Sequence, residues 1–374
     1  MIEAALAVLA VLGVWAAGWA LARFRLQGLD LSSFDLVTGE HFNSGASPSD
    51  EHRAVVASLK GLREALRGVP VWRHIAVLRR YMDELFPHDR LNASFTPIEA
   101  ADVRGEWVLA PGADPRRRTL YIHGGAFSMG SPRSHRRLTS RFAEITGGAV
   151  FAVDYRLLPE HRRLAGIDDC RAAYRWLLEH GPQGSAPAQR IWVAGDSAGG
   201  NLTLSLIAWV RDTGLRAPDA AVAFSPLTDA TLASPSLRSH VRTDPMLGPL
   251  FGRLARVPQH LLLWLGWWQN RIRPADPRIS PVFGDLSRLP PTLVQASAAE
   301  MLHDDARRYV NRARAAGSPV QLQTWAHMVH VWQLFHPELP EGARALDEVQ
   351  RFIANTEQAM GSRNTDPRRT PEIR

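Results

Sequence analysis

The sequence predicts an α/β fold in which a mostly parallel sheet is covered by helices on both faces. From about residue 103 onward, short apolar runs with strand character alternate with longer runs of helical character, the pattern of parallel strands joined by helices. A Gly-x-Ser-x-Gly motif, Gly195 to Gly199, lies where one strand turns into a helix. The 374 residues suffice for one large core or two modest ones. The predicted strands are 107–110, 119–122, 149–153, 191–194, 220–224, 292–296 and 320–324.

Near the N-terminus, residues 4–22 carry no charged or polar side chain. At about 1.5 Å per helical residue, this segment reaches roughly the 30 Å of bilayer hydrocarbon. Because Arg23 and Arg25 follow it and no Lys or Arg precedes it, residues 1–25 are predicted to be an uncleaved transmembrane anchor. The rest of the chain would then be cytoplasmic. The alternative is a secretory signal cleaved after residues 20–22, which would leave a secreted or periplasmic protein.

Residues 26–102 are predicted to form a tether followed by helices of a cap. The stretch 26–48 is rich in Ser, Gly, Asp and Asn, as expected of a tether. Apolar residues recur at helical spacing in 49–67 and again in 71–86. These two helices precede the first strand of the sheet.

Residues 103–358 form the predicted main domain. The alternation of strands and helices breaks at about 230–278, where a long insertion ends in an apolar, tryptophan-rich run and indicates a second piece of the cap. The tail, 359–374, is charged and rich in proline and is predicted to be disordered.

Two motifs in this domain point to nucleophilic chemistry. In Gly195 to Gly199, the sharp turn between strand and helix would hold Ser197 in a strained conformation, with its hydroxyl exposed ahead of a helix. The loop His123 to Phe127 directly follows strand 119–122, and its glycines would let bare backbone N–H groups face a ligand. The two motifs are therefore expected to supply a nucleophile and the backbone donors of its oxyanion hole.

A serine hydroxyl needs a base, and that base needs an acid to hold its tautomer and stabilise its charged form. Glu300 and Asp304 follow strand 292–296, and His330 follows strand 320–324. Along the chain, the order is therefore serine, acid, histidine.

Taken together, these motifs resemble the bacterial hormone-sensitive-lipase-like esterases of the α/β-hydrolase fold, which include acetyl esterases and hydrolases of lactones and small esters. The resemblance runs from roughly residue 103 to 352. It implies a helical cap over an acyl pocket and an ester hydrolase that requires no cofactor and no metal ion. The matching segments are 123–127, 154–161, 195–202, 279–281, 289–292 and 328–332.

Carried over to this sequence, the resemblance makes Ser197 the nucleophile and His330 the base. It assigns the oxyanion hole to the backbone N–H groups of Gly124, Gly125 and Ala198. The third glycine of the family's loop is Ala126 here, which preserves the backbone donor.

The assignment of the acid is less direct, because most members of the family carry an aspartate where this chain has Glu300. Glutamate can fill that role, so Glu300 is the expected acid. Asp304 is the rival, but it stands where a helix is predicted to start, and acidic residues are favoured in a first turn.

The resulting prediction is a serine esterase for short to medium acyl esters. A lactone hydrolase or a deacetylase of a small molecule on the same triad is the alternative. From a different class, a membrane-tethered binding protein on an inactive hydrolase fold stays open. The expected partners are an ester substrate and the membrane. Nucleic acid is not expected, because the arginines that carry most of the +7 charge are scattered. The single Cys170 excludes an internal disulfide.

Overall fold

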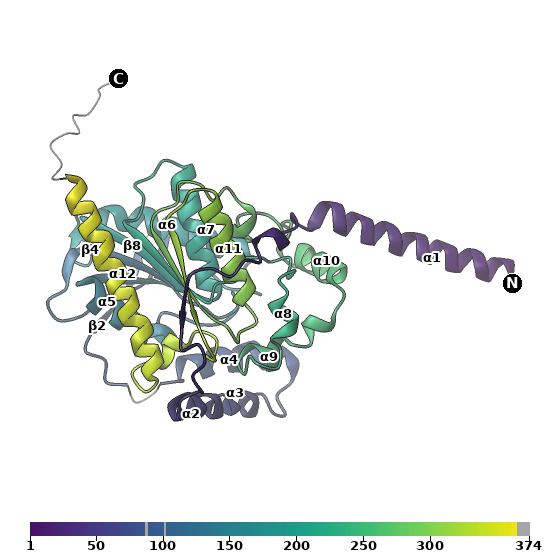
Figure 1. Cartoon of the computed structure of the whole chain (residues 1–374), viewed down its shortest axis with the longest axis horizontal. Helices are drawn as coiled ribbons and strands as arrows, with labels where there is room; N and C mark the ends of the chain where they lie inside the picture. Colours follow the sequence, from purple (N-terminus) through teal and green to yellow (C-terminus); the bar gives the residue numbers. More distant parts are fainter. Residues whose placement is uncertain (87–88, 101, 365–374) are drawn as a thin grey trace, which may run out of the picture.

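We describe the protein from a computed structural model. It covers residues 1–86, 89–100 and 102–364, and within these the side chains at 2–5, 7, 8, 10–12, 14, 63, 363 and 364 are not described. At its centre is a nine-stranded sheet in the order β1-β11-β10-β9-β8-β4-β5-β3-β2 (Figure 1). Its strands are β1 (Glu40–Phe42), β2 (Ser94–Ala100), β3 (Val103–Leu109), β4 (Asp114–Ile122), β5 (Gly148–Val153), β8 (Arg190–Asp196), β9 (Ala220–Phe224), β10 (Thr292–Ser297) and β11 (Val320–Trp325).

All neighbouring pairs from β1 across to β5 run parallel. Strand β3 is antiparallel to both β5 and β2. The mostly parallel sheet predicted from the sequence is thereby confirmed, and each of the seven predicted strands is present. A short hairpin of β6 (His180–Gly181) and β7 (Gly184–Ser185) lies outside this sheet.

Helices cover both faces of the sheet, as predicted. One face carries α6 (Arg163–Glu179), α7 (Ala198–Asp212) and α11 (His303–Ala315), and the other carries α5 (Arg136–Thr146) and α12 (Pro340–Asn364) (Figure 1). Successive strand residues point to opposite faces, so Leu120 and Ile122 join the core on the first face, whereas Tyr121 joins the core on the second. This alternation determines which face of the sheet each residue at the end of β4 points to. It therefore also determines how the following loop leaves the sheet.

The predicted tether, 26–48, is a packed strap. Its β1 extends the edge of the sheet beside β11, and Phe42 stacks on Trp325 with ring centroids 4.5 Å apart. The Asp35 carboxylate accepts two hydrogen bonds of 2.7 Å from Arg308. Neither β1 nor the antiparallel β2 was predicted, because β1 spans only three residues and β2 includes a proline.

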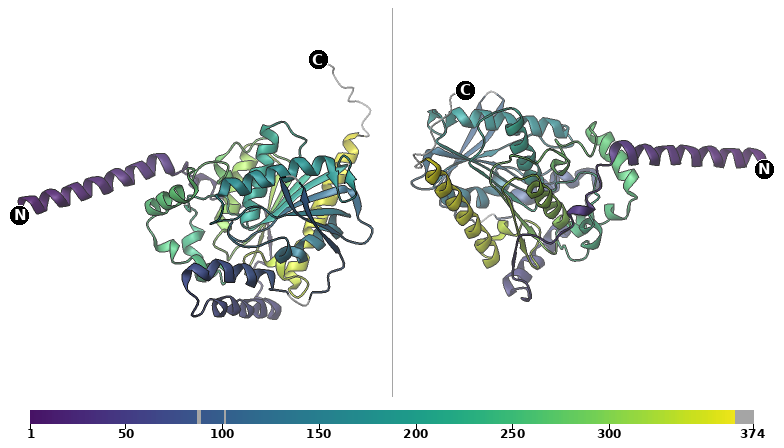
Figure 2. Two further views of the ribbon diagram at one scale, coloured as in Figure 1. Left: turned by 180° about the vertical axis from the view of Figure 1, so that it is seen from behind. Right: turned by 45° about the horizontal axis from the view of Figure 1, so that its top comes forward.

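Helices from two separate segments make up the cap. The first supplies α2 (Asp50–Ser58), α3 (Lys60–Ala65) and α4 (His74–Asp83), and the second, inserted between β9 and β10, supplies α8 (Ser236–Ser239), α9 (Leu247–Phe251) and α10 (Gln259–Asn270). Residues from both segments line one cavity. Figure 2 shows the two segments against the body of the domain from two further directions.

Helix α1 (Ile2–Leu21) projects away from the domain and runs into a π-helical turn, Ala22–Leu26 (Figures 1 and 2). The predicted anchor lies in this helix, but many side chains of its first turns are outside the described set. Within the part of the chain that the structure describes, no helix is both long enough and apolar enough to cross a membrane. The anchor therefore stays a prediction from the sequence.

Residues 359–364, predicted to belong to a disordered tail, are instead the end of α12, which continues to Asn364. Contacts to the sheet explain the extra turns: Glu357 forms an ion pair with Arg117 at 2.9 Å, and Ile353 is buried. The rest of the predicted tail, 365–374, lies outside the described residues.

Candidate active site

Ser197 occupies the turn between β8 and α7. Its backbone has φ 52° and ψ −113°, a conformation that side-chain-bearing residues rarely adopt. A Cβ atom on Gly199 would lie 1.9 Å from the carbonyl oxygen of Ile122, and one on Gly195 would lie 2.6 Å from that oxygen. Only glycine fits at these two positions, and the tight turn leaves the Ser197 hydroxyl facing the cavity.

His330 links Ser197 to Glu300. Its Nε2 lies 2.9 Å from Ser197 Oγ, and its Nδ1 lies 2.6 Å from Glu300 Oε2. The loop after β11 carries His330, the loop after β10 carries Glu300, and Ser197 follows β8, so all three side chains come from the carboxyl ends of parallel strands of one sheet. The arrangement has the geometry of a nucleophile, a base and an acid that orients the base.

The structure brings Glu300 to His330 and places Asp304 elsewhere. Glu300 is fully buried, and its second carboxylate oxygen accepts a 2.8 Å hydrogen bond from the backbone N–H of Ser297. Asp304 lies in the first turn of α11, where it accepts from the N–H of Ser236 and pairs with Arg307 at 2.8 Å. Asp304 therefore has a structural environment of its own.

Two opposing effects act on the His330 imidazole. Burial lowers its pKa, but the hydrogen bond and charge of Glu300, helped by the charges of Asp244 and Asp196, outweigh burial and raise the pKa above the ordinary 6.5. A raised pKa means that the ring accepts a proton readily when one is released nearby. This is the property that a base acting on a serine hydroxyl needs.

The loop after β4 presents backbone donors beside Ser197. The N–H of Gly124 already points at Asp196 Oδ1, 3.2 Å away, and at His135 Nε2, 3.3 Å away. Among the residues that the structure describes, the N–H groups of Gly125, Ala126 and Ala198 have no protein acceptor. Of the three predicted donors, Gly125 and Ala198 are thus free to meet a ligand, whereas the Gly124 N–H is engaged inside the protein.

A buried polar network behind the loop was not predicted as a unit. Asp196 accepts a 2.9 Å hydrogen bond from the Tyr121 hydroxyl and pairs with His135 at 3.3 Å. Burial raises the pKa of Asp196, but the charge and hydrogen bond of His135 outweigh it, so the pKa lies below its usual range. His123 stacks on Tyr155, and burial lowers its pKa to about 3, so it supports the loop as a neutral ring.

No local sequence signal identifies His135 as part of this network. It lies eleven residues after Gly124, in a turn that precedes α5, and only the fold brings it to Asp196. His327, three residues before His330, is exposed.

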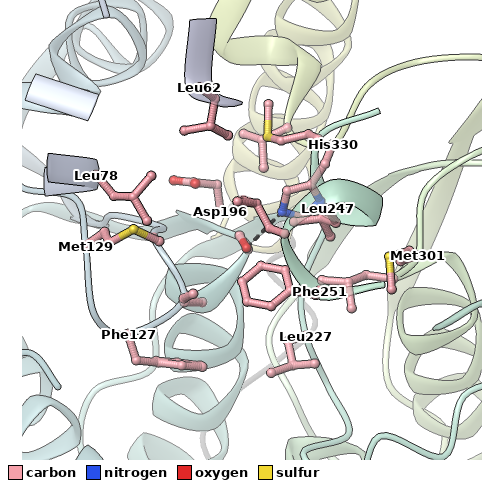
Figure 3. Close-up of a pocket in the computed structure, with 18 of the residues that line it drawn as sticks. Leu62, Leu78, Phe127, Met129, Asp196, Leu227, Leu247, Phe251, Met301 and His330 are labelled. Carbon is pink, nitrogen blue, oxygen red and sulfur yellow. Dashed lines mark hydrogen bonds between the residues drawn. The ribbon is translucent and has the colours of Figure 1, made fainter. Parts of the chain in front are cut away.

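The triad opens into an apolar cavity of about 360 Å³. Figure 3 shows Phe127, Leu227, Leu247 and Phe251 around the hydrogen bond made by His330. The cavity volume falls in the range of small-molecule sites. Of α10, only Leu262 lines the cavity, and the three tryptophans of that helix do not. Leucine, methionine and phenylalanine side chains make up most of the wall: Leu59, Leu62, Leu78, Met82, Leu85, Phe127, Met129, Leu227, Leu232, Leu237, Met246, Leu247, Leu250, Phe251, Leu254, Leu262, Met301, Leu302, Leu334 and Phe335.

Comparison with known proteins agrees with this geometry. Residues 119–334 match the family described as alpha/beta hydrolase fold. An acetyl-hydrolase of Streptomyces hygroscopicus is 40% identical over 248 residues, which cover 66% of this chain and 78% of that protein. Esterase LipU of Mycobacterium tuberculosis is 33% identical over 71% of this chain and 86% of its own length. The crystal structure of an esterase from the bacterial hormone-sensitive lipase family has a TM-score of 0.71 at 33% identity, covering 83% of this chain and 99% of that chain.

Proposed function

This chain belongs to the bacterial hormone-sensitive-lipase-like esterases of the alpha/beta hydrolase fold and is a carboxylic-ester hydrolase, and on that premise we propose that Ser197, His330 and Glu300 are its catalytic triad. The observation that carries the proposal is the continuous hydrogen-bonded line from Ser197 Oγ through both ring nitrogens of His330 to Glu300. Glu300 and the imidazole are almost completely shielded from water, which strengthens their interaction.

The proposed reaction proceeds through an acyl-enzyme. Ser197 Oγ attacks the ester carbonyl carbon while His330 Nε2 takes the hydroxyl proton. The tetrahedral intermediate collapses as the C–O bond to the alcohol breaks, and His330 gives its proton to the leaving alcohol. A water molecule then attacks the acyl-enzyme with His330 again as base, which releases the carboxylic acid and restores Ser197. Throughout, Glu300 stabilises the charged imidazolium.

The proposed oxyanion hole consists of the backbone N–H groups of Gly125, Ala126 and Ala198. Gly125 and Ala198 were expected from the sequence. Ala126 is added here because its N–H has no acceptor within the described residues, whereas the Gly124 N–H does. Each such donor typically contributes about 10²–10³ in rate, because it meets charge that develops in the transition state.

The substrates that the cavity favours are uncharged esters with a short to medium acyl group. Most of its lining is apolar, and the polar exceptions are Tyr81, His135, Asp196, Ser197, Arg238 and His330. A charged acyl chain along the apolar wall would lose its hydration without a partner. A cavity of about 360 Å³ accommodates a small ester rather than several long chains.

A second candidate is the removal of an acetyl group from a small molecule. The acetyl-hydrolase from Streptomyces hygroscopicus, 40% identical to this chain, favours this candidate. Comparing the rates for acetyl esters, longer esters and lactones separates the candidates, since all three use the same triad.

The test uses p-nitrophenyl esters from acetate upward, together with a serine-directed phosphonate. We expect the wild type to hydrolyse the shorter esters and to take up one phosphonate on Ser197, located by peptide mass spectrometry. Ser197→Ala should do neither and should lose at least about 10⁴ in kcat/KM. A wild type that leaves every ester and the phosphonate untouched would overturn the proposal.

We further propose that residues 4–22 anchor the chain in a membrane, with the ester hydrolase domain on the cytoplasmic side. The support is the uncharged sequence ending at Arg23 and Arg25, and the exposed position of Leu6 and Leu9 on a helix that leaves the domain. Alkaline extraction of cell membranes tests the anchor, since an anchored chain stays in the pellet. A mature protein beginning after residue 22 would instead identify a cleaved signal peptide and a secreted or periplasmic enzyme.

A further inference from the structure

Helix α10 has an exposed apolar face that takes no part in the cavity. Four large side chains make up this face: Leu261, Leu265, Trp267 and Trp268, with 48%, 51%, 37% and 62% of their surface exposed. We call these four residues the α10 face. Exposed apolar groups clustered on one helix indicate a binding surface, whereas single exposed ones do not. Paired tryptophans are typical of helices at a membrane–water interface.

Helix α10 also packs against the last turns of α1, as Figures 1 and 2 both show. The indole N–H of Trp264 donates a 3.0 Å hydrogen bond to the backbone carbonyl of Gly18. The Trp15 ring meets His260 edge-on, with ring centroids 5.4 Å apart. A small buried cluster with residues from both segments lies beneath: Ala22, Leu26 and Leu263. The position of α10 is therefore fixed relative to residues 15–26.

This packing determines where α10 would lie if α1 were anchored in a bilayer. Residues 15 to 22 rise about 10 Å along a helix axis. With Arg23 at the membrane surface, the contact between α1 and α10 falls within the outer 10 Å or so of the bilayer. That is the depth at which amphipathic helices lie when they bind a membrane without crossing it.

The surface around the contact between α1 and α10 is positively charged. Neither residues 4–29 nor residues 245–275 include an Asp or a Glu. Six exposed arginines in these two segments form no ion pair among the described residues: Arg23, Arg25, Arg253, Arg256, Arg271 and Arg273. An unpaired basic rim around exposed tryptophans is complementary to anionic lipid headgroups.

A crevice of about 300 Å³ lies between the two segments. Arg23 and Gln27 line it from the N-terminal side, and Gln259 and His260 line it from α10. The Nε2 atom of His260 is covered and has no partner among the described residues. Guanidinium, amide and imidazole groups are the donors that a phosphate group accepts from.

We propose that the α10 face and its six arginines dock on the surface of an anionic lipid bilayer and hold the mouth of the cavity against it. Leu254 is 40% exposed and also lines the cavity, so the docking surface and the cavity share a rim. Esters dissolved in the lipid phase therefore reach Ser197 without passing through bulk water. The inference rests on the proposed anchor and the proposed ester hydrolysis, and it adds the source of the substrate.

The position of α10 is tested with a fluorescent probe on full-length protein in vesicles of phosphatidylglycerol and phosphatidylcholine. The probe is an environment-sensitive dye on Leu265→Cys, and the matched control carries it on Trp72→Cys, an exposed side chain of the first cap segment. The native Cys170 is buried, so labelling is confined to the introduced thiol. We expect the emission at 265 to shift to the blue and to be quenched by lipids spin-labelled near the headgroup, with no change at 72.

The possible outcomes separate the inference from the proposals beneath it. A protein that resists alkaline extraction while the probe at 265 remains as water-exposed as that at 72 would overturn the docking surface and leave the anchor standing. A protein that does not associate with the vesicles would overturn both. Hydrolysis of a dissolved p-nitrophenyl ester by the same sample reports the catalytic proposal independently.

The source of the substrate is tested with Trp267→Ser/Trp268→Ser and with Arg253→Glu/Arg256→Glu. We expect kcat/KM for an ester embedded in anionic vesicles to fall at least about tenfold in both variants, because each loses contacts with the lipid surface. Activity on a dissolved butyrate ester should stay within about twofold, since none of these residues lines the cavity. The control, Arg67→Glu/Arg133→Glu, changes exposed arginines elsewhere and should match the wild type on both substrates. Equal loss on both substrates, or no loss on the vesicle-borne ester, would contradict the inference.

Discussion

At the scale of single residues, Glu300 sets the proton affinity of His330. The carboxylate lies 2.6 Å from the ring and counters the burial that would otherwise lower the pKa of the imidazole. Without Glu300, nothing would hold the His330 ring in the tautomer that accepts a proton at Nε2. The protonated ring would also lose the carboxylate charge that stabilises it.

Glu300→Gln should therefore change the pH profile as well as the rate. We expect kcat/KM to fall by about 10³ or more. The acidic limb of the profile should move to lower pH, because burial then lowers the pKa of His330 and the ring stays neutral, as a base must, in more acidic solution. An acidic limb that stays in place or moves upward in Glu300→Gln would contradict this role.

Gly124 is required because a side chain there would collide with Asp196, and not because its backbone N–H is needed as a donor to the ligand. A Cβ atom there would lie 2.1 Å from Asp196 Oδ2 and 3.0 Å from the backbone oxygen of Asp196. The glycine lets the oxyanion loop lie directly against the turn that carries Ser197.

Gly124→Ala should displace this loop and reduce kcat by about 10²–10³ with a smaller effect on KM. Ala126→Gly is the matched control, because Ala126 already has a positive φ of 53° and keeps its N–H in the variant. We expect the control to stay within a few fold of the wild type in steady-state kinetics. Similar kinetics for the two variants would show that the close approach of Gly124 does not matter.

The sequence pointed to Ser197, Glu300 and His330, the residues of the proposed triad, because each follows a recognisable strand, and the structure brings their side chains together. The polar network could not, since Tyr121, His135 and Asp196 are separated along the chain and share no periodicity. The engagement of the Gly124 N–H by Asp196 was beyond prediction for the same reason.

At the scale of secondary-structure elements, α9 shapes the acyl side of the cavity. Leu247, Leu250 and Phe251 all line it, and Figure 3 shows Phe251 in the same cavity as His330. A piece of the cap was expected at about 230–278, but its division into short helices was not, because Gly248, Pro249 and Gly252 interrupt the helical pattern.

Phe251→Ala should widen the cavity and favour longer acyl chains. We expect the ratio of kcat/KM for octanoate to that for butyrate to rise about five- to tenfold, because two or three more methylenes can then be buried. Leu261→Ala, an exposed position of the cap outside the cavity, should leave the ratio unchanged. An unchanged ratio in Phe251→Ala would place the acyl chain elsewhere.

Asp305, in the first turn of α11, and Asp229, in the segment after β9, form a buried pair of carboxyl groups. Asp305 accepts hydrogen bonds of 2.8 Å from the backbone N–H groups of Thr228 and Asp229. Burial and the nearby charge of Asp229 raise the pKa of Asp305. The folded state therefore binds this proton more tightly than the unfolded state, and the group's contribution to stability declines as pH rises from its unfolded pKa toward its folded one.

Asp305→Asn removes this pH dependence while its oxygen can still accept both hydrogen bonds. We expect the melting temperature of the variant, relative to that of the wild type, to be higher at pH 8 than at pH 5. For a chain of 374 residues, the difference should amount to about 1–2 °C for each kcal/mol relieved. Thermal unfolding followed by circular dichroism at both pH values measures it. A variant that loses stability equally at both pH values would show that the ionised carboxylate is required.

At the scale of the whole molecule, the strap of residues 26–48 closes one edge of the sheet. Asp35 pairs with Arg308, which keeps only 7% of its side-chain surface exposed. This part of the fold was missed in the sequence, because a strap is recognised by long-range partners such as Arg308 and not by its own pattern.

Asp35→Ala should reduce the free energy of unfolding by about 1–3 kcal/mol, since it leaves a largely buried guanidinium without its carboxylate. Asp168→Ala is the control, because Asp168 is 64% exposed and pairs only with Arg171 at 3.4 Å. We expect the control to stay within about 0.5 kcal/mol of the wild type in urea unfolding. Equal effects of the two substitutions would mean that the strap does not contribute to stability through Asp35.

The overall architecture could be predicted from the sequence, because the parallel strands are continuous apolar runs that alternate with helices. The placement of the cap over the triad and of α10 beside α1 was not, since it depends on single contacts such as the hydrogen bond from Trp264 to Gly18. The same fold accounts for an ester hydrolase in which helix α10 packs against the N-terminal helix.

The most direct test of the triad compares Glu300→Ala with Asp304→Ala in the hydrolysis of p-nitrophenyl butyrate, beside Ser197→Ala. We expect kcat/KM to fall by about 10³ or more in Glu300→Ala and to be nearly abolished in Ser197→Ala. Asp304→Ala should keep kcat/KM within about tenfold, since its contacts stabilise α11 and not the imidazole. Near-wild-type activity in Glu300→Ala together with its loss in folded Asp304→Ala would contradict the account.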